Sequence, residues 1–516
     1  MHPVPSSIML EDVSSIVILV HYGRERSWVW ELAARLESSL GRPVELRATS
    51  ARRMPVRLRS ETIDRIIYGS PNPDLTGWFP TKGLKPASSA VVSGCLLIDV
   101  TDAELDEGIQ SACSVVLTPR FEHEKGAHGV IAALARGGMP YVSLIATTAR
   151  ESRELVGARI AVPVRNSIPA FLNTVFARLI TLVDAAVRHL LLGRPLPLTG
   201  PAPVRDVPEP TASYPSMRKA KALIWAHSVA HRMAGHVVRT ADWTIGFRRV
   251  NARQVADVSL DPNDFFWIPC DYGHFYADPM LFTNEGVTYI FFEDYDYASR
   301  LGSLSCVTVE ADGRTGVPVE VMKRSLHLSY PFVLADLGEI YMIPETGADR
   351  RVELWRATRF PNSWELCSVL LNDVEAVDAT VRYDPAQGLW WMFVSVAEPG
   401  GCTYDTLSIY FSDDLKVGWK AHPLNPVKLD PSCSRPAGPI VEEDGAWLRP
   451  AQDCSRGYGS GLAWCRITEL TPETFHEEVV ERWLPPSRYQ GLHTYTRAVG
   501  WEALDLQRRR WRWSRT

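Results

Sequence analysis

Residues 274–294, "HFYADPMLFTNEGVTYIFFED", determine the predicted fold of the second half of the chain. Shifted by 52 positions, they overlap residues 327–347, "HLSYPFVLADLGEIYMIPETG", so that Pro279, Gly286 and Glu293 align with Pro331, Gly338 and Glu345. Both copies have a glycine near the middle and a glutamate near the end, Glu293 and Glu345. Apolar residues on either side of a turn glycine are typical of two antiparallel strands joined by a tight turn. A unit of about 50 residues that repeats in this way predicts a β-propeller, in which each repeat forms one sheet, or blade.

The turn glycine recurs along the rest of the chain, each time with an aromatic or aliphatic residue three positions later. The successive turn glycines are Gly286, Gly338, Gly388, Gly445 and, with a weaker pattern, Gly500. Each interval leaves room for a second, looser pair of strands after the first pair. The sequence therefore predicts an all-β, five-bladed propeller over residues 241–507.

The first part of the chain has a different pattern, in which apolar runs alternate with amphipathic segments. The run "SSIVILV" (14–20) is typical of a buried strand, and "SWVWELAARLESSL" (27–40) has helical spacing. This alternation predicts an α/β domain over residues 1–198, with a mostly parallel, Rossmann-like sheet. We expect a proline-rich linker and a helix at 199–240, and a basic tail at 508–516.

The overall composition limits the classes of function. The chain has 516 residues, of which 46% are hydrophobic and 22% charged, and its formal net charge is −5. These values are typical of a soluble multidomain protein and do not favour a nucleic-acid partner. Nine cysteines without a CxxC pair favour reduced thiols, and hence the cytoplasm. The N-terminus does not resemble a signal peptide, and three charges interrupt the most apolar stretch, 171–193, so we expect no membrane span.

Polar residues recur at two positions of the repeat that a propeller brings to the same rim. The first strand of a blade starts where the antiparallel second strand ends. The residues that start the first strands and those that end the second strands are therefore predicted to lie around one mouth of the central funnel of the propeller. Predicted catalytic residues there are Asp278, Asp378, Glu345 and Glu293; predicted substrate-binding residues are His274, His327, Tyr330, Arg435, Gln452, Asp453 and His493.

Several carboxyl groups around one axis favour acid–base chemistry. Close like charges raise the pKa of a carboxyl group, so one can stay protonated while another is ionised. Cleavage of a glycosidic bond needs such a pair. Arg435 could hold the phosphate or carboxylate of an activated or acidic sugar, and a nucleotide sugar could be the donor. We expect no cofactor and no metal site: an acidic mouth would suit Ca²⁺ on the axis, but no ligand spacing marks one.

The motifs "ADPMLF", "LSYPFVLADLGEIYMIPET" and "VDAT" resemble the propeller domain of plant glucosamine inositolphosphorylceramide transferases. That domain is similar to five-bladed family 43-type glycoside hydrolases. The resemblance implies that Asp278 is the general base and that Asp378 tunes the pKa of the acid and orients it. The hydrolase acid is a glutamate in an "EGP" motif, but here the motif reads "AGP", with Ala437 at that position. Glu345 or Glu293 is then the candidate acid.

In the plant enzymes, sugar transfer is assigned to a separate glycosyltransferase domain. Neither such a domain nor a D-x-D metal site is recognisable in this sequence. The transferase activity therefore does not follow from the resemblance of the propeller alone.

The stretch from Val91 to Leu192 resembles a diverged formyltransferase domain, of the kind that acts on methionyl-tRNA or amino sugars. The catalytic pattern of that family is not retained. The segment "VVLTPRFEHEKGAHG" offers only His123 and His128 as remnants. The resemblance implies a degenerate domain used for docking or for presenting a substrate.

Three functions are consistent with the sequence. The leading hypothesis is a carbohydrate-active enzyme that cleaves or transfers a glycosyl group of a small sugar or glycoconjugate at the propeller funnel. The second is a noncatalytic propeller that binds a glycan or a partner, preceded by a scaffold domain. The third is a formyl or acyl transferase that acts on an amino sugar through its N-terminal domain.

Overall fold

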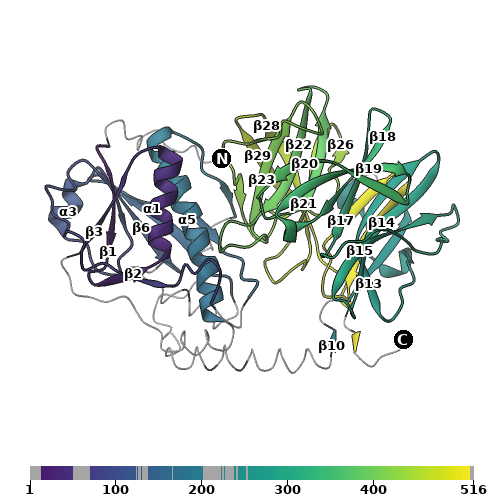
Figure 1. The fold of residues 1–516 in the computed structure, drawn as a ribbon, viewed down its shortest axis with the longest axis horizontal. Helices are drawn as coiled ribbons and strands as arrows, with labels where there is room; N and C mark the ends of the chain where they lie inside the picture. Colours follow the sequence, from purple (N-terminus) through teal and green to yellow (C-terminus); the bar gives the residue numbers. More distant parts are fainter. Residues whose placement is uncertain are drawn as a thin grey trace. The chain divides into compact units, whose positions relative to one another are not determined.

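The computed structural model describes residues 13–49, 70–123, 125, 130, 138–164, 167–200, 222, 226, 238–239, 242–250, 254–508 and 510–511. The chain divides into two compact units, residues 1–230 with 398–402, and residues 231–397 with 403–516. Figure 1 shows the ribbon of both units, with colours that follow the sequence. Most of the predicted linker and basic tail lies outside the described residues, as does His128.

The N-terminal unit contains a six-stranded sheet built on a buried central strand. Its order is β3-β1-β5-β6-β7-β8. The bounds are β1 Ile16–Val20, β3 Val44–Ala48, β5 Leu96–Asp99, β6 Val115–Phe121, β7 Tyr141–Thr147 and β8 Ser152–Arg159, with a separate ribbon of β2 Arg24–Arg26 and β4 Trp78–Pro80. Strands β3, β1, β5 and β6 are parallel, whereas β7 and β8 are antiparallel. The sheet is therefore mixed, and less parallel than the sequence pattern predicts.

Helices α1 (Trp28–Leu40) and α5 (Ile168–Leu192) pack against each other in this unit, and α3 (Glu107–Ala112) is a short third helix (Figure 1). The rings of Trp28 and Phe176 stack at 5.5 Å. By length and composition α5 could cross a membrane, but 94% of its most apolar window is buried. Its Asp184 accepts a hydrogen bond of 2.8 Å from Ser39 Oγ, which suits a core helix. That no segment spans a membrane stays a prediction.

The C-terminal unit contains five sheets that follow the predicted repeat. Blade one is β13 His274–Asn284, β14 Val287–Asp296, β15 Leu301–Val309 and β16 Val319–Met322; blade two is β17 Ser329–Asp336, β18 Glu339–Glu345, β19 Arg351–Arg359 and β20 Ser363–Asn372. Blade three is β21 Ala376–Asp384, β22 Leu389–Val396, β23 Thr406–Ser412, β24 Lys420–Ala421 and β25 Lys428–Leu429; blade four is β26 Val441–Glu443, β27 Ala446–Gln452, β28 Leu462–Leu470 and β29 Phe475–Trp483.

Blade five joins the two ends of the unit. Its order is β12-β11-β31-β30, where β11 is Trp243–Arg249, β12 Phe266–Trp267, β30 Tyr495–Ala498 and β31 Trp501–Gln507. In Figure 1 the yellow C-terminal strands lie beside the teal strands of blade one. A further short pair consists of β10 Val238–Arg239 and β32 Arg510–Trp511, and 3₁₀ turns lie at Val255–Asp257, Pro262–Asp264 and Gly347–Asp349.

Hydrogen bonds between blades close the ring. Tyr495 N–H of blade five donates to Ala437 O of blade four at 2.8 Å, and Leu281 N–H of blade one donates to Thr496 Oγ1 of blade five at 3.2 Å. The five-bladed prediction is confirmed. The composition of blade five was not predicted, because the unit around Gly500 supplies only two of its strands.

The predicted turn glycines adopt the backbone conformation that their turns require. Leu337 and Gly338, between β17 and β18, have φ of 49° and 83°, and Glu285 and Gly286 repeat these signs with 49° and 79°. Two-residue turns with positive φ match the right-handed twist of hairpin strands. Glycine reaches such φ values without steric strain, which explains its recurrence in the sequence.

Replacing Gly338 by alanine is expected to lower the free energy of unfolding by about 1 kcal/mol, because the alanine Cβ is strained at positive φ. Urea unfolding would measure the change. Gly273→Ala is the matched control, since that glycine also has open space around a Cβ and is not among the residues with positive φ. Equal losses for both variants would contradict the conformational explanation.

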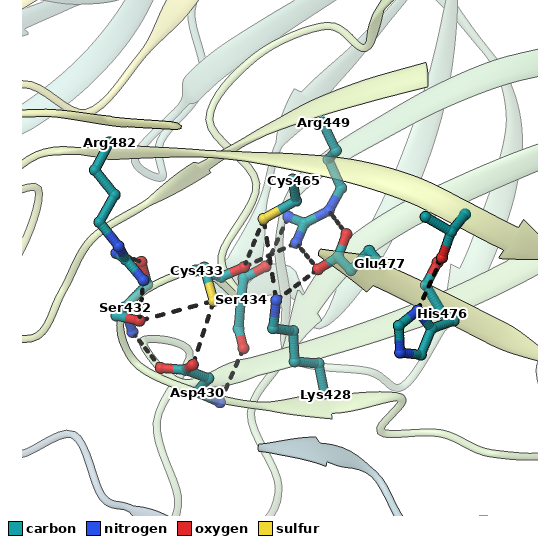
Figure 2. Close-up of polar contacts among 11 residues, drawn as sticks. Lys428, Asp430, Ser432, Cys433, Ser434, Arg449, Cys465, His476, Glu477 and Arg482 are labelled. Carbon is teal, nitrogen blue, oxygen red and sulfur yellow. Dashed lines mark hydrogen bonds and ion pairs between the residues drawn. The ribbon is translucent and has the colours of Figure 1, made fainter. Parts of the chain in front are cut away.

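A buried ion network crosses blade four. Glu477 on β29 receives hydrogen bonds from Lys428 Nζ at 2.8 Å and from Arg449 Nε and Nη2 at 3.0 and 2.6 Å (Figure 2). Burial by itself raises the pKa of Glu477, but the two cations outweigh it and lower this pKa to about 2. Arg449 also donates to the carbonyl oxygens of Cys433 and Ser434, at 2.8 and 3.0 Å. The network therefore fixes the backbone that leads into Arg435.

Candidate active site

The first strands of blades one, two and three carry the same irregularity. Asp278, Tyr330 and Asp378 have φ of 53°, 43° and 56°. The register of each strand shifts at that residue; in blade one, for example, Ala277 pairs with Glu293 but Met280 with Phe291. Two residues then face one on the partner strand, which defines a β-bulge and redirects a side chain.

A positive φ is unfavourable for most residues other than glycine, so its recurrence at the same position of three blades calls for an explanation. Aspartate tolerates a positive φ better than most side chains, whereas a bulky tyrosine does so only under strain of order 1–3 kcal/mol. Proline follows directly after Asp278 and Tyr330. Strained residues at one position of three consecutive blades support a functional site there.

Asp278 is buried and held by neighbouring blades. Its Oδ1 accepts a hydrogen bond of 2.8 Å from Thr494 Oγ1, and its Oδ2 accepts one of 3.2 Å from Tyr330 N–H. His493 Nε2 lies 3.3 Å from Oδ1. Burial raises the pKa of Asp278 to about 6, with a further rise from the charge of Asp378, although His493 opposes the shift. This carboxyl group changes its protonation state close to neutral pH.

His493 lies between two carboxyl groups. Its Nδ1 is 2.7 Å from Asp505 Oδ2, and Trp243 stacks on the imidazole at 3.9 Å. Burial lowers the pKa of His493, but Asp505 and Asp278 outweigh this and raise it above its usual value. The arrangement favours an imidazolium that orients Asp278.

Asp278, His493 and Asp505 offer ligand atoms that lie within 4.8 Å of one another, so a metal ion is conceivable there. The oxygens of Asp505 already accept hydrogen bonds from the N–H groups of His493, Thr494 and Asp278, at 3.0–3.1 Å. Both oxygens of Asp278 are used as well. The donor set fits a hydrogen-bonded chain better than a metal centre.

Asp378 is the second anchored carboxylate. Its Oδ2 accepts hydrogen bonds from Arg435 Nε at 2.6 Å and from Gln452 Nε2 at 2.9 Å. Arg435 also donates to Thr403 Oγ1 at 3.0 Å, and Gln452 Nε2 to Pro436 O at 3.1 Å. Asp378 therefore links blades three and four across the funnel.

The two glutamates are held less firmly. Glu345 Oε2 lies 3.8 Å from Arg435 Nη2, and Glu293 Oε1 lies 3.4 Å from His327 Nε2. Burial raises the pKa of both glutamates well above the usual value. The charge of Asp378 raises the pKa of Glu345 further, and that of Asp278 has the same effect on Glu293. Burial and the neighbouring negative charges therefore shift both glutamates toward the protonated form.

Seven of the eleven predicted site residues contact one another directly or through one neighbour. They are Asp278, Tyr330, His493, Asp378, Arg435, Gln452 and Glu345. Glu293 contacts His327, and burial together with the charges of Asp278 and Glu345 raises its pKa. His274 instead bonds to Asp294 at 2.6 Å, and Asp453 accepts from Ser455 N–H at 2.8 Å. These two side chains have no contact with the cluster among the described residues.

Ala437 is buried in an apolar cluster with Trp464 and Tyr495. The next residue, Gly438, donates its N–H to Tyr330 Oη at 2.7 Å, and a Cβ there would lie 1.9 Å from Tyr495 O. A backbone this tightly packed explains the glycine of the "AGP" motif. The alanine before it completes the hydrophobic packing, and the motif supplies no acid.

Sequence reasoning missed Asp505, Thr494 and Trp243. Asp505 breaks the apolar run of β31 between Leu504 and Leu506, and this was the available signal. Tyr458 was also missed; its ring lies 5.0 Å from the Arg435 guanidinium and 5.2 Å from His493. The aromatic rings of Trp243 and Tyr458 thus flank the two cations of the site.

The structure gives little support to the prediction that His123 and His128 are remnants of a formyltransferase site. His123 is exposed in the turn after β6, and its ring lies 5.4 Å from that of Tyr141. His128 lies outside the described residues. The formyltransferase-like resemblance stays a prediction.

Fold and cluster together define a class: a five-bladed propeller with a buried carboxyl-rich site where the blade strands begin and end. Within it, residues 269–506 match the family model described as "Glucosamine inositolphosphorylceramide transferase 1, N-terminal". The resemblance predicted for the propeller is confirmed by this match.

Individual relatives agree with the family model. Proteins named glucosamine inositolphosphorylceramide transferase 1 are 33% identical over 208 residues in Oryza sativa subsp. japonica and 32% identical over 219 residues in Arabidopsis thaliana. These matches cover 40% and 42% of this chain, but only 28% of each relative.

Solved structures similar to the chain include glycoside hydrolases. A family 43 protein from Bacillus licheniformis is 18% identical, with 42% of this chain and 46% of that chain covered and a TM-score of 0.31. An exo-β-1,3-galactanase from Clostridium thermocellum is 14% identical, with coverage of 47% and 60% and a TM-score of 0.34. A family 117 hydrolase from Zobellia galactanivorans is 12% identical, with coverage of 52% and 91% and a TM-score of 0.34.

Proposed function

We propose that the propeller cleaves or transfers a glycosyl group of a sugar or glycoconjugate at its carboxyl-rich site. One observation carries the proposal: Asp278 and Glu345 belong to one carboxyl-rich cluster, in which burial raises the pKa of Asp278 to about 6 and that of Glu345 well above its usual value. Such a pair can supply a base and an acid at the same pH. The relatives named as transferases agree with chemistry at a sugar.

In the proposed reaction, Asp278 accepts the proton of the attacking hydroxyl group, from water or from an acceptor. The attacking oxygen forms a bond to the anomeric carbon while the bond to the leaving oxygen breaks. Glu345 gives its proton to the leaving oxygen, and Glu293 is the alternative acid. Asp378, Arg435 and the imidazolium of His493 hold the reacting groups in place.

The proposal predicts a bell-shaped pH dependence of kcat/KM. The rising limb is expected at about pH 6, because Asp278 accepts a proton only when it is ionised. The falling limb reflects loss of the proton from Glu345, whose pKa lies well above its usual value. Initial rates measured from acidic to alkaline pH would show both limbs. Highest activity below pH 5, where Asp278 is protonated, would contradict its role as base.

A ligand and product screen tests the proposal directly. Nucleotide sugars, phosphorylated sugars and simple glycosides would be offered to the wild type and to Asp278→Asn. We expect at least one sugar to bind both proteins and only the wild type to release a product. If no sugar binds the wild type, the site is not a sugar site.

A noncatalytic, glycan-binding propeller is the second candidate. It is favoured because each central aspartate has its own cation: Asp278 pairs with His493, and Asp378 with Arg435. The "AGP" motif, in which Ala437 is buried, also favours it. In this case the wild type would bind a sugar but form no product at any pH.

A further inference from the structure

Tyr458 lies on a short loop of blade four that reaches the carboxyl-rich site. Residues 453–461 connect β27 to β28, and Ser460 N–H donates to Asp453 O at 2.9 Å, which closes the loop at its base. A glycine stands on each side of Tyr458 in the sequence. The tyrosine is therefore carried by a loop whose two ends are held together.

Gly459 allows this loop to lie directly against His493. Its φ is 59°, and a Cβ there would lie 2.7 Å from His493 Cβ and 3.1 Å from Trp243 Cη2. Only glycine fits so close an approach at a positive φ. Gly459 O also accepts a hydrogen bond of 2.8 Å from the N–H of Leu492, the residue before His493. The loop that carries Tyr458 is thus fixed beside the site.

The ring of Tyr458 lies close to both cations of the site. Its centre is 5.0 Å from Arg435 Cζ and 5.2 Å from the centre of the His493 imidazole. Arg435 bonds to Asp378, and His493 Nε2 is 3.3 Å from Asp278 Oδ1. Tyr458 is therefore next to the groups that hold the two central aspartates.

The hydroxyl group of Tyr458 is free. Its Oη has no hydrogen-bond partner within the part of the chain that the structure describes, and it is not one of the fully buried oxygens without a partner, so it stays open to solvent. Arg435, by contrast, directs Nε to Asp378 and Nη1 to Thr403. The phosphate or carboxylate of a ligand, which the sequence-based prediction assigned to Arg435, would compete with these bonds.

The charges of the site keep the Tyr458 phenol protonated. Burial raises the pKa of Tyr458 well above its usual value, and the charge of Arg435 opposes this shift. The charges of Asp278, Asp378 and Glu345 raise this pKa further. At neutral pH the phenol is therefore a hydrogen-bond donor rather than a base.

We infer that Tyr458 contacts the substrate of the proposed reaction, and that its hydroxyl group donates a hydrogen bond to the glycosyl group beside Asp278 and Glu345. A donor on a fixed loop orients a ligand at little cost, because its own position is set before the ligand binds. The inference rests on the proposed function and adds a residue that orients the sugar.

Tyr458→Phe removes only this hydroxyl group and tests the inference. The full chain would be titrated calorimetrically with UDP-glucose, glucose phosphate and the para-nitrophenyl glycosides of glucose, galactose and xylose, and the compound that the wild type binds most tightly becomes the probe. We expect Tyr458→Phe to bind this probe about threefold to tenfold more weakly. Its kcat/KM should fall by at least the same factor at every pH, with both limbs of the pH profile retained, because a neutral phenol transfers no proton.

Tyr383→Phe is the matched control, because Tyr383 is 44% exposed near the end of β21 and its ring packs on Trp390. This variant should bind and convert the probe like the wild type. Thermal unfolding of each variant shows whether it is folded.

The possible failures can be told apart. A folded Tyr458→Phe variant with the affinity and turnover of the wild type would overturn the inference but leave the proposed function intact. Loss of the falling limb of the pH profile in this variant would make Tyr458 the proton donor, and would overturn its role in orientation alone. Failure of every compound to bind the folded wild type would overturn both the inference and the proposed function.

Discussion

An Asp278→Asn variant is expected to lose turnover by about a hundredfold to ten-thousandfold while it binds sugar with nearly unchanged affinity. Asparagine has the same shape but cannot accept the proton of the attacking group. Its Oδ1 can still accept from Tyr330 N–H, and its Nδ2 can donate to Thr494 Oγ1, so both hydrogen bonds of the aspartate can be kept. Single-turnover rates and ligand affinity, measured on the same preparation, separate these effects.

Two further measurements make this result specific. Asp336→Asn, at the outer end of β17, should keep the turnover of the wild type. Thermal stability of Asp278→Asn should match or exceed that of the wild type, because the substitution removes a buried charge. A folded variant that retains full turnover would show that Asp278 is not the base.

Glu477→Ala is expected to lower the free energy of unfolding by about 3–5 kcal/mol, the largest stability effect predicted here. The substitution leaves Lys428 and Arg449 buried without their shared counter-charge. Glu478→Ala, at the exposed next position of β29, is the control and should change stability by less than about 0.5 kcal/mol. Chemical denaturation of both variants measures the difference.

The same network has a defined pH dependence. The pKa of Glu477 is lowered from its usual value of 4.5 to about 2 in the folded protein, so its contribution to stability is present above pH 4.5 and is lost as the pH falls toward 2. The free energy of unfolding of wild type and of Glu478→Ala should therefore fall between pH 4.5 and 2 by an amount that is missing in Glu477→Ala. An unchanged slope of stability against pH in Glu477→Ala would contradict this assignment.

Local signals made the propeller and most of its rim predictable. The turn glycines define hairpins through backbone conformation alone, and antiparallel pairing then brings Glu293 opposite Ala277 and Glu345 opposite Ser329. The number of residues between the turn glycine and a given residue therefore fixes where that residue lies along the hairpin. This is why counting along the sequence placed the two glutamates at the rim.

Other parts of the site depend on pairing that the sequence does not reveal. Asp505 reaches Asp278 because β31 pairs with β11 from the beginning of the unit. Asp453 was predicted as a site residue, but it lies just beyond the end of β27, and its side chain accepts a hydrogen bond from Ser455 N–H in the following loop. The bulges that aim Asp278 and Asp378 leave no mark on the alternation of polar and apolar residues.

The composite fifth blade has a consequence for protein synthesis. Trp243 at the start of β11 pairs with Gln507 at the end of β31, so the ring cannot be completed until nearly the whole unit has left the ribosome. Asp505, which accepts hydrogen bonds from the backbone N–H groups of Asp278 and His493, is translated in that same strand. A chain that stops before β31 therefore lacks both a closed ring and an ordered site. Cellular proteases would meet such a product as an open, unfinished protein rather than as a partly working enzyme.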